Sequence, residues 1–270
     1  MPNVQLRNTL LLMGASFIWG TAFVAQSVGA DHMGPYSFLA GRSWLACVFL
    51  LGLMAVLGKA GKTNSAAEPG FWQNRKVLVK GGTCCGIALF AASAAQQMGI
   101  GTTSTAKAGF MVPVFGVFFG RRPGVKLWCC VAASVVGLYL LCLAGHDSLA
   151  LTGGEWQLLG CAFLFATQIL LVDHFSPKLD GIQLSFVQFL TVAVISTVFM
   201  LIFEQPTIEQ FRLAAVAIAY CGIMSSGVAY TLQIVGQKAL DPTIASLAMC
   251  LESVFSALAG WLILGETLST

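Results

Sequence analysis

Long apolar segments follow one another along almost the whole chain, and they limit what it can fold into. A helix needs about 20 mostly apolar residues to cross a bilayer. The sequence contains nine segments of about this length, at residues 9–29, 35–57, 77–98, 102–119, 125–144, 155–174, 182–203, 211–235 and 242–264. Because lipid offers the backbone no hydrogen-bond partners, such segments fold as helices. The sequence therefore predicts an all-α, polytopic membrane helix bundle with nine transmembrane helices in this chain.

The composition excludes a water-soluble protein. Only 9% of the residues are charged and 57% are hydrophobic, whereas a soluble domain carries about 25% charged residues. The 29 glycines suit helices that pack closely in a membrane. The nine cysteines show no C-x-x-C spacing, so we interpret them as small apolar packing residues rather than as disulfides or metal ligands. No metal and no cofactor is predicted.

Basic residues are unevenly distributed between the two sides that alternating spans create. If the N-terminus lies in the cytoplasm, the outer flanks hold only Arg212. The inner loops and flanks then hold eleven basic residues, namely Arg7, Lys59, Lys62, Arg75, Lys76, Lys80, Arg121, Arg122, Lys126, Lys178 and Lys238. Because the cytoplasmic loops of membrane proteins are enriched in Lys and Arg, this asymmetry predicts a cytoplasmic N-terminus.

The two halves of the chain share three weakly similar stretches in the same order. The matched pairs, at offsets of 146, 136 and 140 residues, are "LLMGASFIWGT" (11–21) with "QLLGCAFLFAT" (157–167), "CGIALFAASAAQQ" (85–97) with "CGIMSSGVAYTLQ" (221–233), and "TSTAKAGFMVPVF" (103–115) with "TIASLAMCLESVF" (243–255). A duplicated unit of five helices explains them. Because five is odd, the second copy is inverted, as is typical of secondary transporters with a substrate site near the midplane. A tenth helix would complete the second copy, and the sequence stops before it.

Five stretches form a recognisable combination: "ASFIWGTAFVAQSVG", "PYSFLAGRSWLA", "QQMGIGTTSTAKAGF", "SPKLDGIQLSFVQF" and "DPTIASLAMCLESVFSALAGWLILGETLS". Together they resemble the EamA branch of the drug/metabolite transporter (DMT) superfamily. The resemblance implies a multi-pass protein of the bacterial inner membrane that exports amino acids and other small metabolites. It implies two EamA repeats, residues 1–146 with helices one to five and residues 147–270 with helices six to nine. It also implies a central cavity lined by the first, third, fourth, sixth, eighth and ninth helices. Relative to the family pattern, the tenth helix is missing and the fourth is short.

Three ionisable side chains deep in the predicted spans are candidates for substrate binding. Arg42 lies about 10 Å below the outer surface, and we expect it to face the bundle interior rather than to snorkel to the headgroups. Lys107 lies in the same leaflet, so the two cations could attract a carboxylate or phosphate, or Lys107 could pair with an acid. Glu252 lies near the midplane, where it could pair with Lys107, carry a proton for coupling, or remain a neutral structural carboxyl. Pro113 frees a backbone carbonyl in mid-helix and is the predicted hinge.

Aromatic and amide side chains complete the predicted substrate site. Trp19 and Tyr230 are candidates for aromatic walls, although aromatic residues on helices more often serve packing alone. Gln97, Gln168 and Gln233 are amides in apolar helices, and such groups need a polar partner on another helix or on the substrate. Gln97 and Gln233 occupy matching positions in the two copies, which favours them as substrate-binding residues.

These features predict a secondary transporter that exports small polar metabolites, amino-acid-like or related, by alternating access. Its predicted partners are a small-molecule substrate and the lipid bilayer, with no nucleic acid, and the choice between monomer and homodimer stays open. The substrate, the direction of transport and the coupling to protons also stay open. The alternative is a non-transporting truncated remnant or membrane scaffold. An intramembrane enzyme is the weakest interpretation, because the chain lacks H-E-x-x-H and G-x-S-x-G motifs and paired aspartates in the spans.

Overall fold

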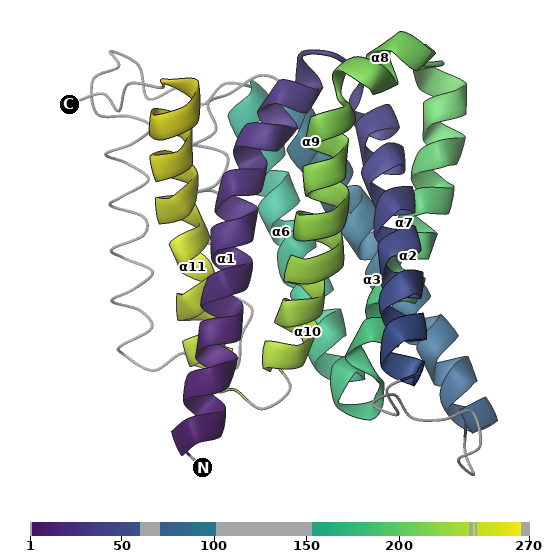
Figure 1. The fold of residues 1–270 in the computed structure, drawn as a ribbon, viewed down its shortest axis with the longest axis vertical. Coiled ribbons are helices and arrows are strands. Elements are labelled where there is room, and N and C mark those ends of the chain that lie inside the picture. Colours follow the sequence, from purple (N-terminus) through teal and green to yellow (C-terminus); the bar gives the residue numbers. More distant parts are fainter. Residues whose placement is uncertain (1, 60–70, 101–152, 238–239, 241, 266–270) are drawn as a thin grey trace.

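The computed structural model describes residues 2–59, 71–100, 153–237, 240 and 242–265, and these residues form helices joined by short turns (Figure 1). The long helices are α1 (Pro2–Ala30), α2 (Pro35–Lys59), α3 (Phe71–Ile100), α6 (Gly153–Phe175) and α7 (Gly181–Phe203). The chain continues through α8 (Ile208–Leu213), α9 (Ala215–Ala219), a π-helical segment (Tyr220–Ala229) and α10 (Tyr230–Gln237). The last described helix, α11 (Pro242–Ala259), ends in a short π-helical turn (Gly260–Leu264).

Most of the long described helices have the length and composition of membrane spans. Five segments are long and apolar enough to cross a membrane, namely Val4–Ala30, Pro35–Leu57, Arg75–Ile100, Gly181–Phe203 and Ala215–Gln237. The predicted all-α, multi-pass membrane fold is therefore confirmed. The predicted spans 102–119 and 125–144 lie outside the described residues, together with Lys107 and Pro113. The total of nine spans and the division into two inverted repeats stay predictions.

The predicted span at residues 211–235 differs from the structure at its start. A separate short helix, α8, begins there because the hydroxyl of Thr207 accepts from the N–H of Gln210 while the Gln210 side chain accepts from the N–H of Thr207. This helix ends before Ala214, and the spanning stretch begins at Ala215. The prediction missed the break because the capping residues lie just outside the apolar segment and an alanine carries no sign of a turn.

The turn between α1 and α2 is held by a carboxylate from the end of α7. Pro35 begins α2, where its fixed φ suits the first helical turn. The N–H groups of Tyr36 and Ser37 donate to the Glu204 carboxylate at 2.9 Å and 2.7 Å. A negative charge is stabilised at this position because a helix N-terminus carries a partial positive charge. A Cβ on Gly34 would overlap the same carboxylate, so a larger residue there would displace Glu204 from the start of α2. The contact fixes the end of α7 beside the start of α2.

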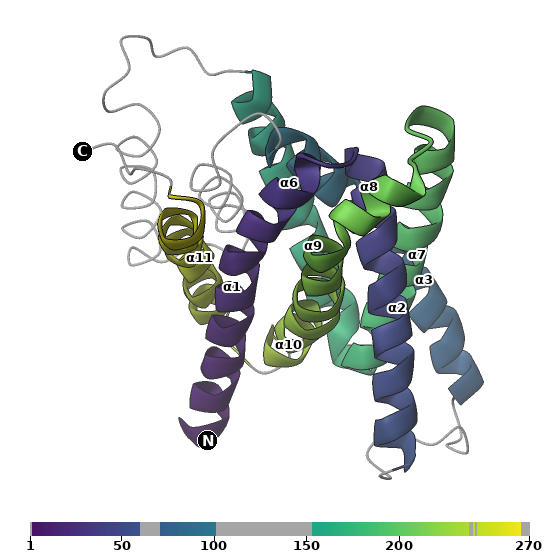
Figure 2. The same cartoon turned by 45° about the horizontal axis from the view of Figure 1, so that its top comes forward.

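Helices α1 and α11 run side by side and approach closely through small residues (Figures 1 and 2). The hydroxyl of Ser16 donates to the carbonyl of Ala248 at 2.9 Å. One turn further along, a Cβ on Gly20 would lie 2.8 Å from the Ser256 nitrogen and 2.9 Å from the Glu252 carbonyl oxygen. Two small residues spaced four apart let membrane helices bring their backbones together. This seam places the Glu252 segment of α11 directly against α1.

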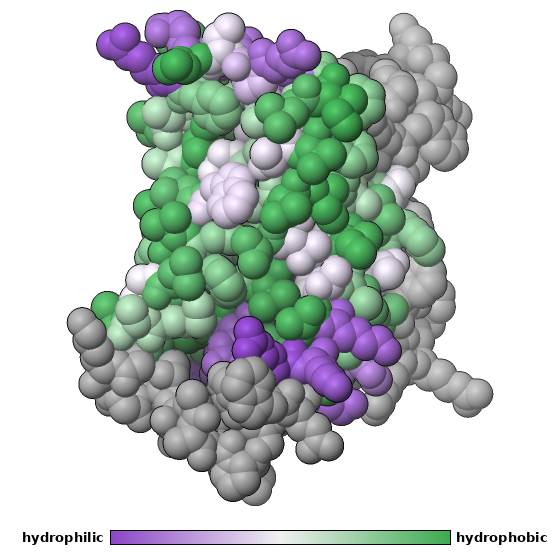
Figure 3. Space-filling view, turned by 90° about the vertical axis from the view of Figure 1, so that its right-hand side faces the viewer, coloured by the Kyte–Doolittle hydropathy of each residue, from purple (hydrophilic) through white to green (hydrophobic). Residues whose placement is uncertain are grey.

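The outer surface consists of an apolar belt between two polar ends. Figure 3 shows the belt as a band of hydrophobic residues between hydrophilic groups at the top and the bottom. Exposed large apolar side chains of the spans include Val48, Leu51, Val198, Leu201 and Val216. Such a surface is stable against hydrocarbon rather than water. The belt therefore marks the part of the bundle that lies in the membrane.

The described basic residues gather at one end of the bundle. Figure 1 shows the start of α1, the start of α3 and the turn between α6 and α7 at the same end, with α8 at the other. The basic residues at the first end include Arg7, Lys59, Arg75, Lys76, Lys80 and Lys178, whereas α8 carries Arg212 and Arg42 lies inside the bundle. We refer to these two ends as the basic end and the α8 end.

The α1–α11 seam gives a test of the packing. We expect Gly20→Ala to lower the unfolding temperature, at a cost of about 1–3 kcal/mol, because the new methyl group meets backbone atoms that cannot rotate away. Gly14→Ala, on the same helix, has nothing within 4 Å of its added Cβ and should be neutral or slightly stabilising. Thermal unfolding of the detergent-solubilised protein measures both. Equal unfolding temperatures for the two variants would contradict the close approach.

Candidate functional site

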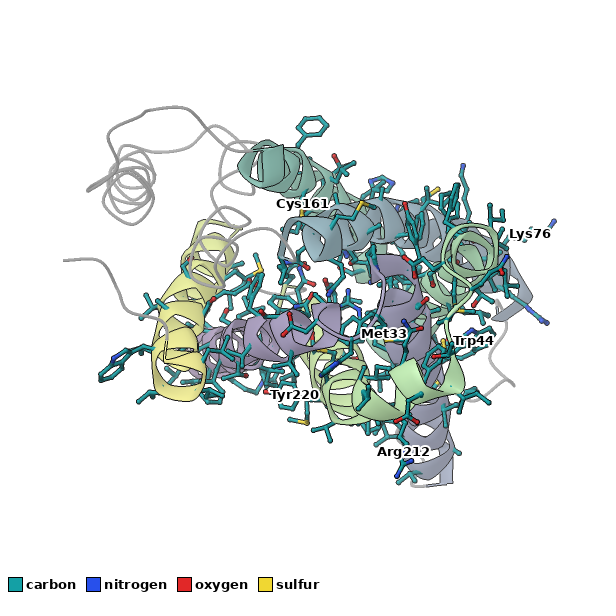
Figure 4. The ribbon with its side chains drawn as sticks, turned by 90° about the horizontal axis from the view of Figure 1, so that it is seen from above. Met33, Trp44, Lys76, Cys161, Arg212 and Tyr220 are labelled. Atoms are coloured by element: carbon teal, nitrogen blue, oxygen red, sulfur yellow. The ribbon has the colours of Figure 1, made fainter. Side chains whose placement is uncertain are left out.

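Polar side chains gather inside the bundle, away from the apolar belt. The buried set includes Gln26, Arg42, Ser93, Gln96, Gln97, Gln168, Gln188, Gln233 and Glu252. Seen from the α8 end, Met33 and Cys161 lie among the helices, whereas Lys76 and Arg212 lie at the rim (Figure 4). Burial of polar groups at membrane depth is costly unless they find partners. We use the name central polar cluster for the connected residues Trp19, Gln26, Arg42, Ser93, Gln97, Tyr230 and Glu252.

Arg42 is the buried cation of this cluster. It lies two turns into α2 and is only 4% exposed, so the expectation that it faces the interior is confirmed and the snorkelling alternative is wrong. Its Nη1 donates to Gln26 Oε1 at 3.1 Å, and its guanidinium carbon lies 6.0 Å from the centre of the Phe38 ring. The thiol of Cys221 lies near the guanidinium and interacts electrostatically with it.

The contacts of Arg42 leave its charge without a counter-ion. Gln26, Phe38 and Cys221 are all neutral partners. Among the side chains that the structure describes, the ion pair is Arg212 with Glu209, at 3.9 Å on the surface of α8, and no carboxylate pairs with Arg42. Its Nε is buried and has no hydrogen-bond partner. Within the described part of the chain, the central polar cluster therefore carries an uncompensated positive group.

Gln26 and Gln97 join three helices around this cation. Gln26 on α1 accepts from Arg42 on α2 through its side chain. Its backbone carbonyl accepts from Nε2 of Gln97 on α3 at 3.0 Å. The Oε1 atom of Gln97 is buried and has no partner. The contacts hold the Arg42 head group in one position while leaving an acceptor on Gln97 available.

Tyr230 forms the aromatic centre of the cluster. Its ring contacts Trp19 and Phe189 in edge-on arrangements, with ring centroids 4.9 Å and 5.3 Å away. Its hydroxyl lies near Ser93 and interacts electrostatically with both Arg42 and Glu252. The indole Nε1 of Trp19 is buried without a hydrogen-bond partner. The two predicted wall residues, Trp19 and Tyr230, thus lie together. Each carries a polar atom, the indole nitrogen of Trp19 and the hydroxyl oxygen of Tyr230.

The π-helical segment before Tyr230 brings this residue and Arg42 to the same region. A Cβ on Gly222, in this segment, would lie 2.9 Å from the Arg42 carbonyl oxygen, so the two backbones touch there. The Cys221 thiol lies 3.9 Å from the carbonyl oxygen of Ala22 on α1. Departures of this kind from α-helical geometry often occur at functional sites because they widen a helix locally. No pattern in the sequence predicts this segment.

Glu252 lies on the α11 side of the cluster. It is 8% exposed and interacts electrostatically with Tyr230 and with Cys161 of α6. The predicted pairing with Lys107 falls outside the described residues. Glu252 and Arg42 thus both lie near one tyrosine, on helices from the two ends of the sequence. The proposed roles of Glu252 in substrate binding and proton coupling stay predictions.

The remaining predicted amides lie on other inner surfaces. Gln168 of α6 donates through Nε2 to Gln188 Oε1 of α7 at 3.3 Å, while Gln168 Oε1 and Gln188 Nε2 have no partner. The Nε2 atom of Gln233 lies 3.8 Å from the sulfur of Met249, and its Oε1 has no partner. A buried polar atom without a partner costs about 1–3 kcal/mol. Their unpartnered atoms are suited to bind water or a polar solute.

Unpartnered donors and acceptors together define what this region can bind. Within the central polar cluster, Trp19 and Arg42 offer N–H groups, and Gln97 offers a carbonyl oxygen. Among the described residues, no three His, Cys, Asp or Glu side chains lie close enough to hold a metal ion. The arrangement is suited to holding a small solute by hydrogen bonds and charge. Substrate binding by each predicted residue stays a prediction.

Sequence reasoning missed three members or neighbours of the cluster: Gln26, Ser93 and Cys221. Gln26 lies seven residues after Trp19 and therefore on the same face of α1, a spacing that could have identified it. Serine and cysteine are common in membrane helices, so Ser93 and Cys221 carried no distinguishing pattern.

Comparison with known proteins gives this site a context. The model of the EamA-like transporter family matches residues 7–143 and 152–270. A protein of Archaeoglobus fulgidus, described as "Uncharacterized transporter", is 25% identical over 268 residues, which cover 94% of this chain and 77% of that protein. A protein of known crystal structure shares the fold with a TM-score of 0.70 at 19% identity, covering 98% of this chain and 90% of that one.

Proposed function

Because this chain belongs to the EamA-like transporter family, and is therefore a membrane transporter, we propose that it exports small polar metabolites as a secondary transporter. The proposed substrate site is the central polar cluster, and the proposed location is the bacterial inner membrane. The observation that carries the proposal is the set of buried, unpartnered polar atoms on Trp19, Arg42 and Gln97. Such atoms are costly in a membrane interior unless water or a solute satisfies them.

The contacts between the two parts of the sequence support alternating access as the mechanism. At the α8 end, Glu204 binds the start of α2. At the basic end, Nδ2 of Asn8 on α1 donates to the carbonyl of Gly236 on α10 at 3.3 Å. Between them, the Thr21 and Tyr220 hydroxyls are hydrogen-bonded at 2.6 Å. In the proposed motion, the contacts at one end break while those at the other end hold.

We also propose that the basic end lies in the cytoplasm. Among the described residues, more basic side chains belong to that end than to the α8 end, which carries Arg212. This asymmetry motivates the orientation. Green fluorescent protein fused after Lys59 should fluoresce in cells, and alkaline phosphatase fused after Glu204 should be active. The exchanged fusions serve as controls and should be inactive. Phosphatase activity after Lys59, with none after Glu204, would reverse the orientation.

Transport is tested with the purified full chain in proteoliposomes loaded with radiolabelled amino acids, hydroxy acids, sugars and phosphate esters. We expect at least one class to leave faster than from protein-free liposomes. Gln97→Leu should slow that efflux by about tenfold or more, because the substitution removes the buried acceptor.

The matched control for Gln97→Leu is Gln5→Leu, the same change at an exposed position of α1. The control should transport at the wild-type rate. If no compound in the panel moves, the proposed function fails. If Gln5→Leu and Gln97→Leu behave alike, transport does not involve the central polar cluster.

A further inference from the structure

We propose that the transported solutes carry a carboxylate group, and that Arg42 holds it in a position set by Gln26. This inference rests on the proposed transport function and makes it specific, because it assigns the chemical class of the substrate and the residue that selects it. It predicts that the charge of the solute, rather than its size, decides which compounds move.

The first argument is the uncompensated charge. A guanidinium remains charged in proteins, and a charge at membrane depth normally pairs with an acid or faces water. Arg42 is 4% exposed, yet its described partners are an amide, a thiol and an aromatic ring. Neutral partners satisfy hydrogen bonds but do not neutralise a charge. An anion from outside the chain would do both, because it would also take the unpartnered Nε–H.

The second argument is the geometry of the guanidinium. Its N–H groups form a planar fork that matches the two oxygens of a carboxylate. One arm, Nη1, is held by Gln26 Oε1 at 3.1 Å, and the Nε–H on another part of the fork has no partner. One positive charge matches the single negative charge of a carboxylate, whereas a phosphate group carries nearly two. A carboxylate therefore suits this environment better than a phosphate.

The third argument is the arrangement of neighbouring groups. Gln97 is bonded to the backbone of Gln26, and its buried Oε1 can accept a hydrogen bond from a solute N–H or O–H. The solute class is therefore a carboxylate with a nearby hydrogen-bond donor. Gln26 acts as a positioning residue, because it orients Arg42 without supplying charge.

Matched pairs of compounds test the inference in the same proteoliposomes. Each acid is compared with its primary amide: leucine with leucinamide, phenylalanine with phenylalaninamide, and lactate with lactamide, with glycerol phosphate as a further probe. We expect the wild-type protein to move at least one acid about tenfold or more faster than its amide, because a charge-assisted bond is lost in the amide.

Three variants assign this preference to Arg42. Arg42→Gln should remove the preference, and Arg42→Lys should restore part of it. Gln26→Glu places a carboxylate beside the buried cation, so it should remain folded, with an unfolding temperature at or above that of the wild type. It should also slow the acids to the rate of the amides, because the internal carboxylate occupies the site. The controls are Arg212→Gln at the exposed end of α8 and Gln5→Glu on α1, and both should keep the wild-type preference.

The outcomes separate this inference from the function on which it rests. If none of the compounds leaves the proteoliposomes, both the transport function and the inference are overturned. Equal efflux of acids and amides, or efflux of glycerol phosphate in preference to every acid, overturns the inference alone. Arg42→Gln and Gln26→Glu could both lower the rates for acids and amides equally and leave the preference for acids intact. Arg42 would then be structural, and this result also overturns the inference. If Arg42→Gln fails to fold, the Gln26→Glu variant and the wild-type ratio of acid efflux to amide efflux still test the inference.

Discussion

Hydrocarbon as the surrounding solvent is the constraint on which the rest of this structure depends. Lipid offers polar groups no partners, so each must find one inside the bundle. At the helix seams this requirement is met: Ser16 bonds to Ala248, and Asn8 bonds to Gly236. In the centre it is met only in part, because Arg42 and Trp19 retain buried donors without partners. The contrast separates polar residues that join helices from those that are available to a solute.

The position of the cluster follows from close helix contacts around it. The small residues of the α1–α11 seam place the Glu252 segment against α1, and Gly222 places the π-helical segment against α2 beside Arg42. Tyr230 follows this segment directly and thereby lies between Trp19 and Phe189. Backbone packing at glycine and serine thus determines where the cation, the acid and the aromatic rings lie. Functional geometry here is a consequence of small residues that themselves bind nothing.

The sequence predicted those features that follow from the free-energy cost of placing a polar group in the membrane. An arginine inside an apolar segment has few energetically acceptable places, so the interior position of Arg42 could be predicted. Its partners could not, because Gln26 and Cys221 are chemically unremarkable in sequence and are brought close only by tertiary packing. The break at Ala214 and the π-helical segment escaped prediction for a similar reason, since local composition there favours an unbroken helix. The predictions for Lys107 and Pro113 concern residues outside those that the structure describes.

The central claim is that the interior holds a cation that no carboxylate of the chain neutralises and that water or a solute can reach. A density map of the full chain in lipid nanodiscs, at a resolution that shows ordered water, tests it most directly. The account predicts density for water or a solute within hydrogen-bond distance of Arg42 Nε. A carboxylate of the chain itself bonded to that nitrogen, or a dry apolar contact in its place, would contradict the account.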